Sequence, residues 1–140
     1  MQMLYQWDRT RDPIDRVAGL FWQIRSGTEE MKAMAERLAR GAQREHEAID
    51  AAITTASTNW RLERIASVDL NILRIASYEL MREPQTPVSV IIDEAVEMAK
   101  RFGEADSPPF VNGVLDAIGR LLRTPDPGRT RPPGRRKRSP

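Results

Sequence analysis

The sequence predicts an all-α fold of six or seven helices with short connections. Apolar residues recur at spacings of three and four along most of the chain, as in Ile91, Ala95, Met98 and Phe102. No segment alternates apolar and polar residues between turn signals, and the β-branched cluster at 88–92 runs directly into a helical pattern. Proline, glycine and capping residues separate the periodic segments, so we expect several helices and no repeat of fixed period.

The first 28 residues are expected to hold two helices. Residues 1–7 are rich in apolar side chains and fit the end of a helix that packs on the core through Leu4. Asp12 fits the N-cap of a second helix and Pro13 its first turn. The inner face of this second helix is expected to carry Ile14, Val17, Leu20, Phe21 and Ile24.

A long third helix is expected from about Glu29 to Ser57. It begins at Thr28 and carries two acidic residues in its first turn, where the helix dipole favours negative charge. Its inner face is expected to hold Met31, Met34, Ala35, Leu38, Ala42, Ile49, Ile53 and Ala56. Gly41 costs about 1 kcal/mol relative to alanine in a helix. Either this glycine permits a close helix contact, or the helix breaks there.

The most hydrophobic helix follows a short helical segment at 62–66 and is expected to begin with Ser67 as its cap. Apolar residues cover most of its circumference: Val68, Leu70, Ile72, Leu73, Ile75, Ala76, Leu80 and Met81. A helix that is apolar nearly all round is buried on several sides, so this helix is expected to be the central element. Pro84 and Pro87 then separate it from the next helix.

Residues 90–116 predict a helix, a tight loop and a second helix that ends near Arg123. Gly103 follows the first of these helices, at a position that commonly needs a positive φ angle. Ser107 fits the N-cap of the last helix and Pro108 its first turn. The loop between them spans Gly103–Asp106.

Two aromatic residues, Phe102 and Phe110, flank this loop and allow two interpretations. Aromatic faces can stack on the bases of single-stranded RNA, backbone N–H groups of the last helix can receive a phosphate, and Arg101 and Arg120 can supply charge. Alternatively, both phenylalanines are core residues on the apolar faces of their helices.

Composition separates the chain into a folded domain, 1–124, and a tail, 125–140. The tail has no Val, Ile, Leu, Met or aromatic residue, so we expect it to be disordered. Its six basic residues and Asp126 give it a net charge of +5, which leaves −3 for the rest of a chain whose formal charge is +2. Such a tail either contacts nucleic acid electrostatically or only keeps the protein soluble.

No candidate for catalysis emerges. There are no cysteines, which excludes disulfides, thiolate catalysis and cysteine-ligated zinc. The single histidine, His46, is expected to be an exposed bystander, and Asp93, Glu94 and Glu97 fit a solvated helix face with ordinary ion pairs. No signal peptide or membrane-spanning stretch is present, so we expect a non-enzymatic cytoplasmic protein without cofactors or metals.

Several separated motifs resemble the NusB transcription antitermination family. They are MLYQWD at the start, NWRLERIASVDL and ILRIASYEL in the middle, and VSVIIDEAVEMAKRFGEADSPPFVNGVLD, in the family's order. The resemblance covers about residues 1–118. It implies two small packed helical bundles and a non-catalytic protein that pairs with a small-subunit ribosomal protein, NusE. The family's heterodimer binds boxA RNA in transcripts of ribosomal RNA operons and, with other Nus factors, modifies the RNA polymerase elongation complex.

The resemblance also implies roles for individual residues. It places Phe102, Asp106 and Phe110 near RNA, with Tyr5 on the same side, and directs Glu63 and Asp69 toward the ribosomal-protein partner. Arg101 is the expected charged neighbour of this RNA-facing edge.

Two departures from the family pattern affect RNA binding. Family members usually carry an Arg-rich segment before the LYQW helix, and this sequence starts inside that helix. We therefore expect either a longer natural protein or a weaker RNA binder in which the tail, through residues such as Arg135 and Arg136, partly replaces those arginines. Second, Pro108 and Pro109 stand where relatives often carry polar or basic residues.

Two other functions stay open from the sequence. NusB-like RNA-binding domains also precede the catalytic domain of some ribosomal RNA cytosine methyltransferases, although only a basic tail follows residue 123 here. A helical adaptor without RNA contact is the other alternative. A homodimer is also open, because the first helix would expose Met3 and Leu4 if nothing covered them.

Overall fold

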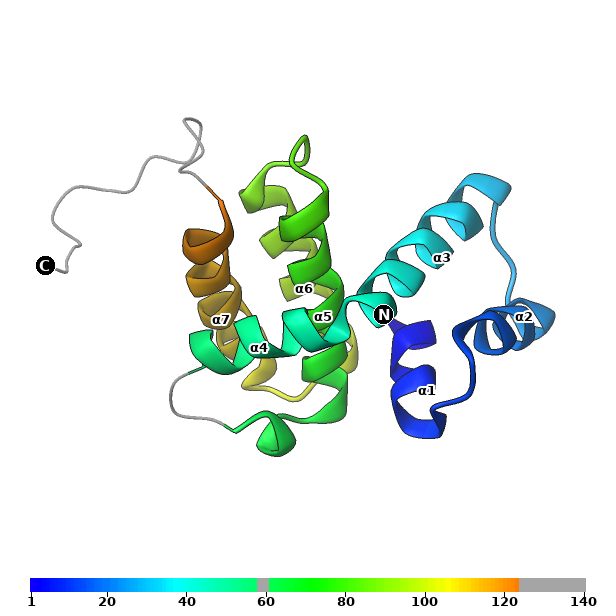
Figure 1. Ribbon diagram of the computed structural model, residues 1–140, viewed down its shortest axis with the longest axis horizontal. Helices are drawn as coiled ribbons and strands as arrows, with labels where there is room; N and C mark the ends of the chain where they lie inside the picture. The colour runs from blue at the N-terminus through cyan, green and yellow to red at the C-terminus, as the bar shows by residue number, and fades with distance from the viewer. Residues whose placement is uncertain (58–60, 124–140) are drawn as a thin grey trace, which may run out of the picture.

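A computed structural model describes residues 1–57 and 61–123, and all regular secondary structure in this part of the chain is helical, as predicted (Figure 1). The elements are α1 (Gln2–Thr10), α2 (Ile14–Ile24), α3 (Glu29–Arg44), α4 (His46–Ala56), the 3-10 turn η1 (Leu62–Arg64), α5 (Ser67–Arg82), α6 (Val88–Phe102) and α7 (Ser107–Leu122). None of these helices is both long and apolar enough to cross a membrane. The predicted tail, with Arg135 and Arg136, lies outside the described residues.

The helices form the two expected bundles. One contains α1, α2 and α3, and the other contains α4 to α7 (Figure 1). The hydrophobic helix α5 is the central element, since it packs against α6 and α7 in its own bundle and against α1 and α3 in the other. Its buried side chains include Ile72, Leu73 and Leu80, each at most 2 % exposed. The sequence therefore predicted the helix on which both bundles depend.

Several predicted apolar faces differ from those in the structure. Met3 and Leu4 are buried, so the prediction that the first helix exposes them is wrong, and with it the reason given for a homodimer. Leu20, Met31 and Met34, in contrast, are exposed although their spacing placed them on inner faces. In this three-helix bundle, small residues such as Ala18 and Ala39 face the core and bring the helices close, which leaves the longer side chains at the edge.

The predicted long third helix is two helices, and the break lies at Glu45 instead of Gly41. Glu45 leaves the helical conformation, with φ −105° and ψ 20°, and its carboxylate accepts hydrogen bonds of 2.7–3.0 Å from Arg82 on α5. Gly41 serves the other expected purpose. A Cβ atom there would lie 2.2 Å from Cζ of Tyr78, so glycine permits the close crossing of α3 and α5.

The starts of α2, α3, α5, α6 and α7 were predicted within one or two residues, and that of α4 was not predicted. Most of the predicted caps are wrong. Thr28 caps α3 as expected, since its hydroxyl accepts a hydrogen bond from the backbone N–H of Met31. The N-cap positions of α2, α5 and α7 are occupied by Pro13, Ala66 and Asp106. None of these residues makes a capping hydrogen bond through its side chain. Local sequence signals locate a helix terminus more coarsely than cap geometry does.

Candidate nucleic-acid interface

The loop between α6 and α7 is tight because three residues approach each other closely. Gly103 has φ −99°, so the predicted positive φ angle is wrong. Glycine is needed for space instead, since a Cβ atom there would lie 2.6 Å from the Ser107 hydroxyl and 2.9 Å from the Ala99 carbonyl oxygen. The sequence marked the correct residue for a different physical reason.

Ser107 joins this loop to α5 through hydrogen bonds of its hydroxyl and does not serve as the N-cap of α7. Its buried hydroxyl accepts a hydrogen bond from the backbone N–H of Glu104 (2.9 Å) and donates one to Asp69 on α5 (3.1 Å). Burial raises the pKa of Asp69 despite the hydrogen bond from Ser107. The negative charges of Asp106 and Glu104 act in the same direction as burial. Asp69 is therefore a buried support of the loop, 8 % exposed.

The N-terminus of α7 does not offer the phosphate site that the sequence suggested. The backbone N–H of Ser107 donates to the carbonyl oxygen of Glu104 (3.0 Å), and that of Phe110 donates to Asp106 (3.3 Å). Pro108 and Pro109 between them have no N–H. A phosphate at the start of α7 would therefore have to be bound by side chains.

The outer surface of the loop presents an aromatic ring beside a cation. Phe102 is 38 % exposed, and the guanidinium of Arg101 lies 5.1 Å from the centre of its ring. Asp106 is exposed next to them, whereas Phe110 is half-buried and packs against the core. Each interpretation of the aromatic pair therefore applies to one residue. Phe102 is available to a base, whereas Phe110 is partly a core residue. Arg120 is bound to Asp116 at 2.6 Å.

Tyr5 repeats this arrangement on α1, in the other bundle. Its ring is half-buried, and the exposed Arg9 places its guanidinium 5.7 Å from the ring centre. Arginine beside an aromatic ring combines a stacking face with a charge that can bind phosphate. Two such pairs, one on each bundle, are therefore available to a nucleic acid strand.

The two residues predicted to face a protein partner lie on η1 and in the first turn of α5. Glu63 is exposed on η1 and free to contact another molecule's surface, whereas Asp69 points beneath the α6–α7 loop toward Ser107.

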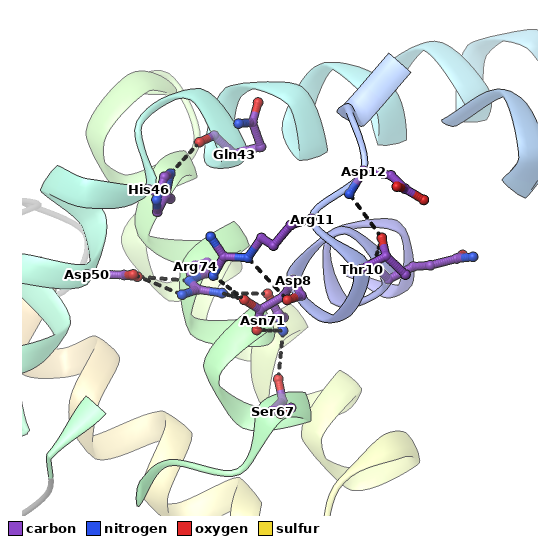
Figure 2. A network of polar contacts seen from close by, with 11 residues as sticks. Asp8, Thr10, Arg11, Asp12, Gln43, His46, Asp50, Ser67, Asn71 and Arg74 are labelled. Atoms are coloured by element: carbon purple, nitrogen blue, oxygen red, sulfur yellow. Dashed lines mark hydrogen bonds and ion pairs between the residues drawn. The ribbon is translucent and has the colours of Figure 1, made fainter. Parts of the chain in front are cut away.

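Sequence reasoning missed a buried polar network between the bundles (Figure 2). Arg74 on α5 is 2 % exposed and donates two hydrogen bonds to Asp50 on α4, at 2.8 and 2.9 Å. The same guanidinium lies 3.1 Å from Asp8 on α1 and donates to Asn71. Arg11, whose backbone has a φ angle of 59°, donates a further hydrogen bond to Asp8 at 2.9 Å. One cation thus joins three helices of both bundles.

Asp8 and His46 show how this network extends. Partial burial acts to raise the pKa of Asp8, but the charge and hydrogen bonds of Arg74, with that of Asn71, outweigh it and lower the pKa. His46 is not the exposed bystander that was predicted. It is half-buried, and its Nδ1 lies 2.8 Å from the Gln43 carbonyl oxygen (Figure 2). Its ring meets that of Trp7 edge to face, with the ring centres 5.2 Å apart.

The signal for this network was present in the sequence. Arg74 is the only charged residue within ILRIASY, a stretch of the helix whose apolar residues cover most of its circumference. A charged side chain on a helix buried on several sides must be paired, because an isolated buried charge is strongly unfavourable. The pattern therefore could have predicted that Arg74 has acidic partners, although not which ones.

Comparisons with known proteins agree with this architecture. Residues 1–120 match the NusB family model. The transcription antitermination protein NusB of Sorangium cellulosum is 47 % identical over 122 residues, which cover 87 % of each chain. That of Anaeromyxobacter dehalogenans strain 2CP-1 / ATCC BAA-258 is 45 % identical over 119 residues, covering 84 % of this chain and 83 % of that one.

Solved structures share the fold as well. T. maritima NusB superimposes with a TM-score of 0.76 at 36 % identity, over 85 % of this chain and 84 % of that one. A complex of antitermination factors NusB and NusE with dsRNA gives the same TM-score at 24 % identity, over 85 % of this chain and 89 % of that one, and so shows the fold alone. From the family match and these relatives, the chain belongs to the NusB family.

Proposed function

We propose that this protein is a transcription antitermination factor that binds boxA RNA together with the ribosomal protein NusE. The curated relatives carry the name of transcription antitermination proteins. In this proposal the chain acts in the cytoplasm, without catalysis, as a subunit that brings RNA to the RNA polymerase elongation complex with other Nus factors. Its chemistry is recognition, which needs exposed rings and charges.

One observation carries the RNA-binding part of the proposal, namely the exposed ring of Phe102 beside Arg101. A phenylalanine that is 38 % exposed at a rigid loop loses packing energy unless something covers it, and a nucleobase is a suitable cover. The buried contact between Ser107 and Asp69 holds this loop in place, so the ring needs little ordering when RNA binds. Asp106 at the loop can accept a hydrogen bond from a base edge or a ribose hydroxyl.

Charge must come from the arginines around these rings and from the tail. The chain without residues 125–140 has a net charge of −3, so its general field repels RNA. We propose that Arg135, Arg136 and their neighbours supply sequence-independent phosphate affinity, because this affinity depends on charge count. Deletion of residues 125–140 should reduce the slope of log boxA affinity against log salt concentration. An unchanged slope would show that the tail does not contribute to phosphate binding.

The protein partner is proposed to contact the surface near η1. Glu63 is exposed there and can pair with a basic residue of NusE, while Asp69 supports the neighbouring loop. We propose no homodimer through α1, since Met3 and Leu4 are buried in the chain's own core.

A filter-binding assay with boxA RNA, with and without NusE, tests the proposal. Phe102→Ala should weaken binding by about 1–3 kcal/mol, the usual contribution of one stacked base. Leu20→Ala is the matched control, since Leu20 is equally exposed, at 41 %, on the distant helix α2. If neither the chain nor its complex with NusE binds boxA RNA more tightly than a scrambled RNA, the helical adaptor becomes the better account.

A further inference from the structure

A groove between the two bundles has no role in the proposed RNA recognition. It lies between α3, α5 and α6 beside Met1 and has a volume of about 550 Å³. Its walls are largely apolar, with Met31, Met34 and Leu38 from α3, Ile75 from α5 and Met98 from α6. Four carboxylates also line it: Glu79, Asp93, Glu94 and Glu97. We call it the α3–α5–α6 groove.

Glu79 is the unusual residue of this groove. It is only 8 % exposed, and its carboxylate has no hydrogen bond or ion pair with any residue in the described part of the chain. Burial raises its pKa to about 7, and the negative charges of Glu94 and Glu83 add to that effect. The positive charges of Arg37 and of the Met1 amino terminus act in the opposite direction but do not offset burial. A further cation beside this buried carboxylate would therefore be favourable.

The part of the groove formed by α3 also has uncovered apolar side chains. Met31 and Met34 are 61 % and 50 % exposed and stand one helical turn apart on α3, so together they form an exposed apolar strip. Methionine side chains adapt to different partners and are common on surfaces that receive helices. Glu97 is paired with Lys100 at 3.0 Å, but the lining still carries an excess of carboxylates. The groove therefore offers apolar contact and excess negative charge within one site.

We propose that the α3–α5–α6 groove binds a basic amphipathic helix of a partner protein, with one Arg or Lys side chain on Glu79 and apolar side chains on Met31 and Met34. The chain's own tail matches the charge but has no Val, Ile, Leu, Met or aromatic residue for the apolar wall. RNA is excluded because its phosphates would meet four carboxylates. A helix with arginines flanking an apolar stripe satisfies both parts of the site.

The test measures binding of a labelled helical peptide to the full chain by fluorescence anisotropy. The probe is an 18-residue acetylated and amidated peptide with Leu and Ala on one face and Arg on its flanks. The control peptide has Glu in place of each Arg. We expect the basic peptide to bind and the acidic peptide to show no measurable binding, whereas equal binding of both would overturn the proposal.

Three variants locate the binding site. Glu79→Gln removes the buried charge and should weaken the basic peptide about tenfold, and Met34→Lys should weaken it at least as much by placing a cation in the groove. Glu47→Gln is the control, since Glu47 is an exposed carboxylate on α4 outside the groove and its loss should change affinity by less than about twofold. Similar affinities for Glu79→Gln and Glu47→Gln would mean that only overall charge is being measured and would overturn the proposal.

A pH series separates Glu79 from the other charges. If the bound cation requires ionised Glu79, affinity should rise about tenfold from pH 6 to pH 8, because the ionised fraction of a group with a pKa of about 7 rises by that factor. Glu94, Glu83, Arg37 and the amino terminus of Met1 also face Glu79, so Glu79→Gln provides the baseline for their contribution. An equal pH dependence in this variant would contradict a contact with Glu79.

Two further outcomes would assign the groove to a different occupant. Light scattering that shows a dimer dispersed by Met34→Lys would assign it to a second copy of this chain. Tighter peptide binding after Arg135→Ser and Arg136→Ser would assign it to the tail. Either result overturns the proposal. Glu79→Gln should leave boxA affinity within about twofold, so failure here is distinguishable from failure of the proposed function.

Discussion

Arg74 joins the two bundles, and its replacement by alanine should destabilise the protein more than the loss of any exposed ion pair. Its side chain is 3 % exposed, and those of its partners Asp50 and Asp8 are 16 % and 13 % exposed. Removing the guanidinium leaves the largely buried Asp50 without its cation and leaves Asp8 with only the exposed Arg11 as a cationic partner. The Arg74→Ala variant therefore tests how much this network contributes to the stability of the contact between α1, α4 and α5.

The expected magnitude follows from the burial of the pair. Removing one partner of a buried ion pair costs about 3–5 kcal/mol, because the remaining charge is uncompensated. Such a loss is a large fraction of the roughly 5–15 kcal/mol that stabilises a typical domain. Arg37 provides a matched control, because its guanidinium lies 2.7 Å from Glu83 but its side chain is 50 % exposed. Exposed pairs contribute about 0–1 kcal/mol, so Arg37→Ala should have a small effect.

Urea unfolding followed by far-ultraviolet circular dichroism measures both variants. The midpoint for Arg74→Ala should fall strongly with little change in m, and Asp50→Asn in the same chain should recover part of the loss by removing one unpaired charge. The pKa of Asp8 is lowered in the folded state, so its stabilisation is complete above the unfolded pKa of 3.8 and disappears as pH falls further. This acid dependence should weaken in Arg74→Ala. Equal destabilisation by Arg74→Ala and Arg37→Ala would refute the reasoning.

Three further predictions concern packing, charge and the loop. Gly41→Ala should cost about 1–3 kcal/mol by overpacking against Tyr78, while Gly113→Ala, where an added Cβ meets nothing within 4 Å, should stabilise α7 by about 0.5–1 kcal/mol; thermal unfolding of both variants checks this. Glu79→Gln should raise the free energy of unfolding by about 1–3 kcal/mol at pH 8 and change it little at pH 4.5. The raised pKa means that ionised Glu79 destabilises the folded state, and this penalty grows as pH rises from 4.5 to about 7. Urea unfolding at both pH values measures the difference. Phe110→Ala should weaken boxA binding while the helical circular dichroism spectrum is kept, and loss of that spectrum would make Phe110 mainly a core residue.

Helical periodicity predicted most of the fold because it reports directly which face of a helix is buried. The helix around Ile72 is apolar on nearly all sides, and the structure places it at the centre of both bundles. Periodicity could not predict the break at Glu45, since the apolar pattern continues through it and the Glu45 carboxylate is bound by Arg82, 37 residues away in the sequence. It also placed Leu20 and Met34 inside, because spacing alone does not say how wide the buried stripe is.

The site was predicted less completely than the fold. The loop at Gly103–Asp106 was found from its flanking aromatics and glycine, but its geometry depends on a contact between Ser107 and Asp69 that only the folded chain brings together. The same limit hid the network of Arg74, whose partners come from α1 and α4. Residues far apart in the sequence meet through packing, which local spacing does not specify.

The most direct test of the proposed RNA face is the affinity of the complex with NusE for boxA RNA in the Phe102→Ala variant, measured beside the wild type and Leu20→Ala. Phe102 is exposed, so its truncation should leave the free energy of unfolding nearly unchanged while removing a stacking surface. The account predicts a loss of about 1–3 kcal/mol in binding free energy for Phe102→Ala alone. Wild-type affinity in Phe102→Ala would contradict the assignment of the α6–α7 loop to RNA recognition.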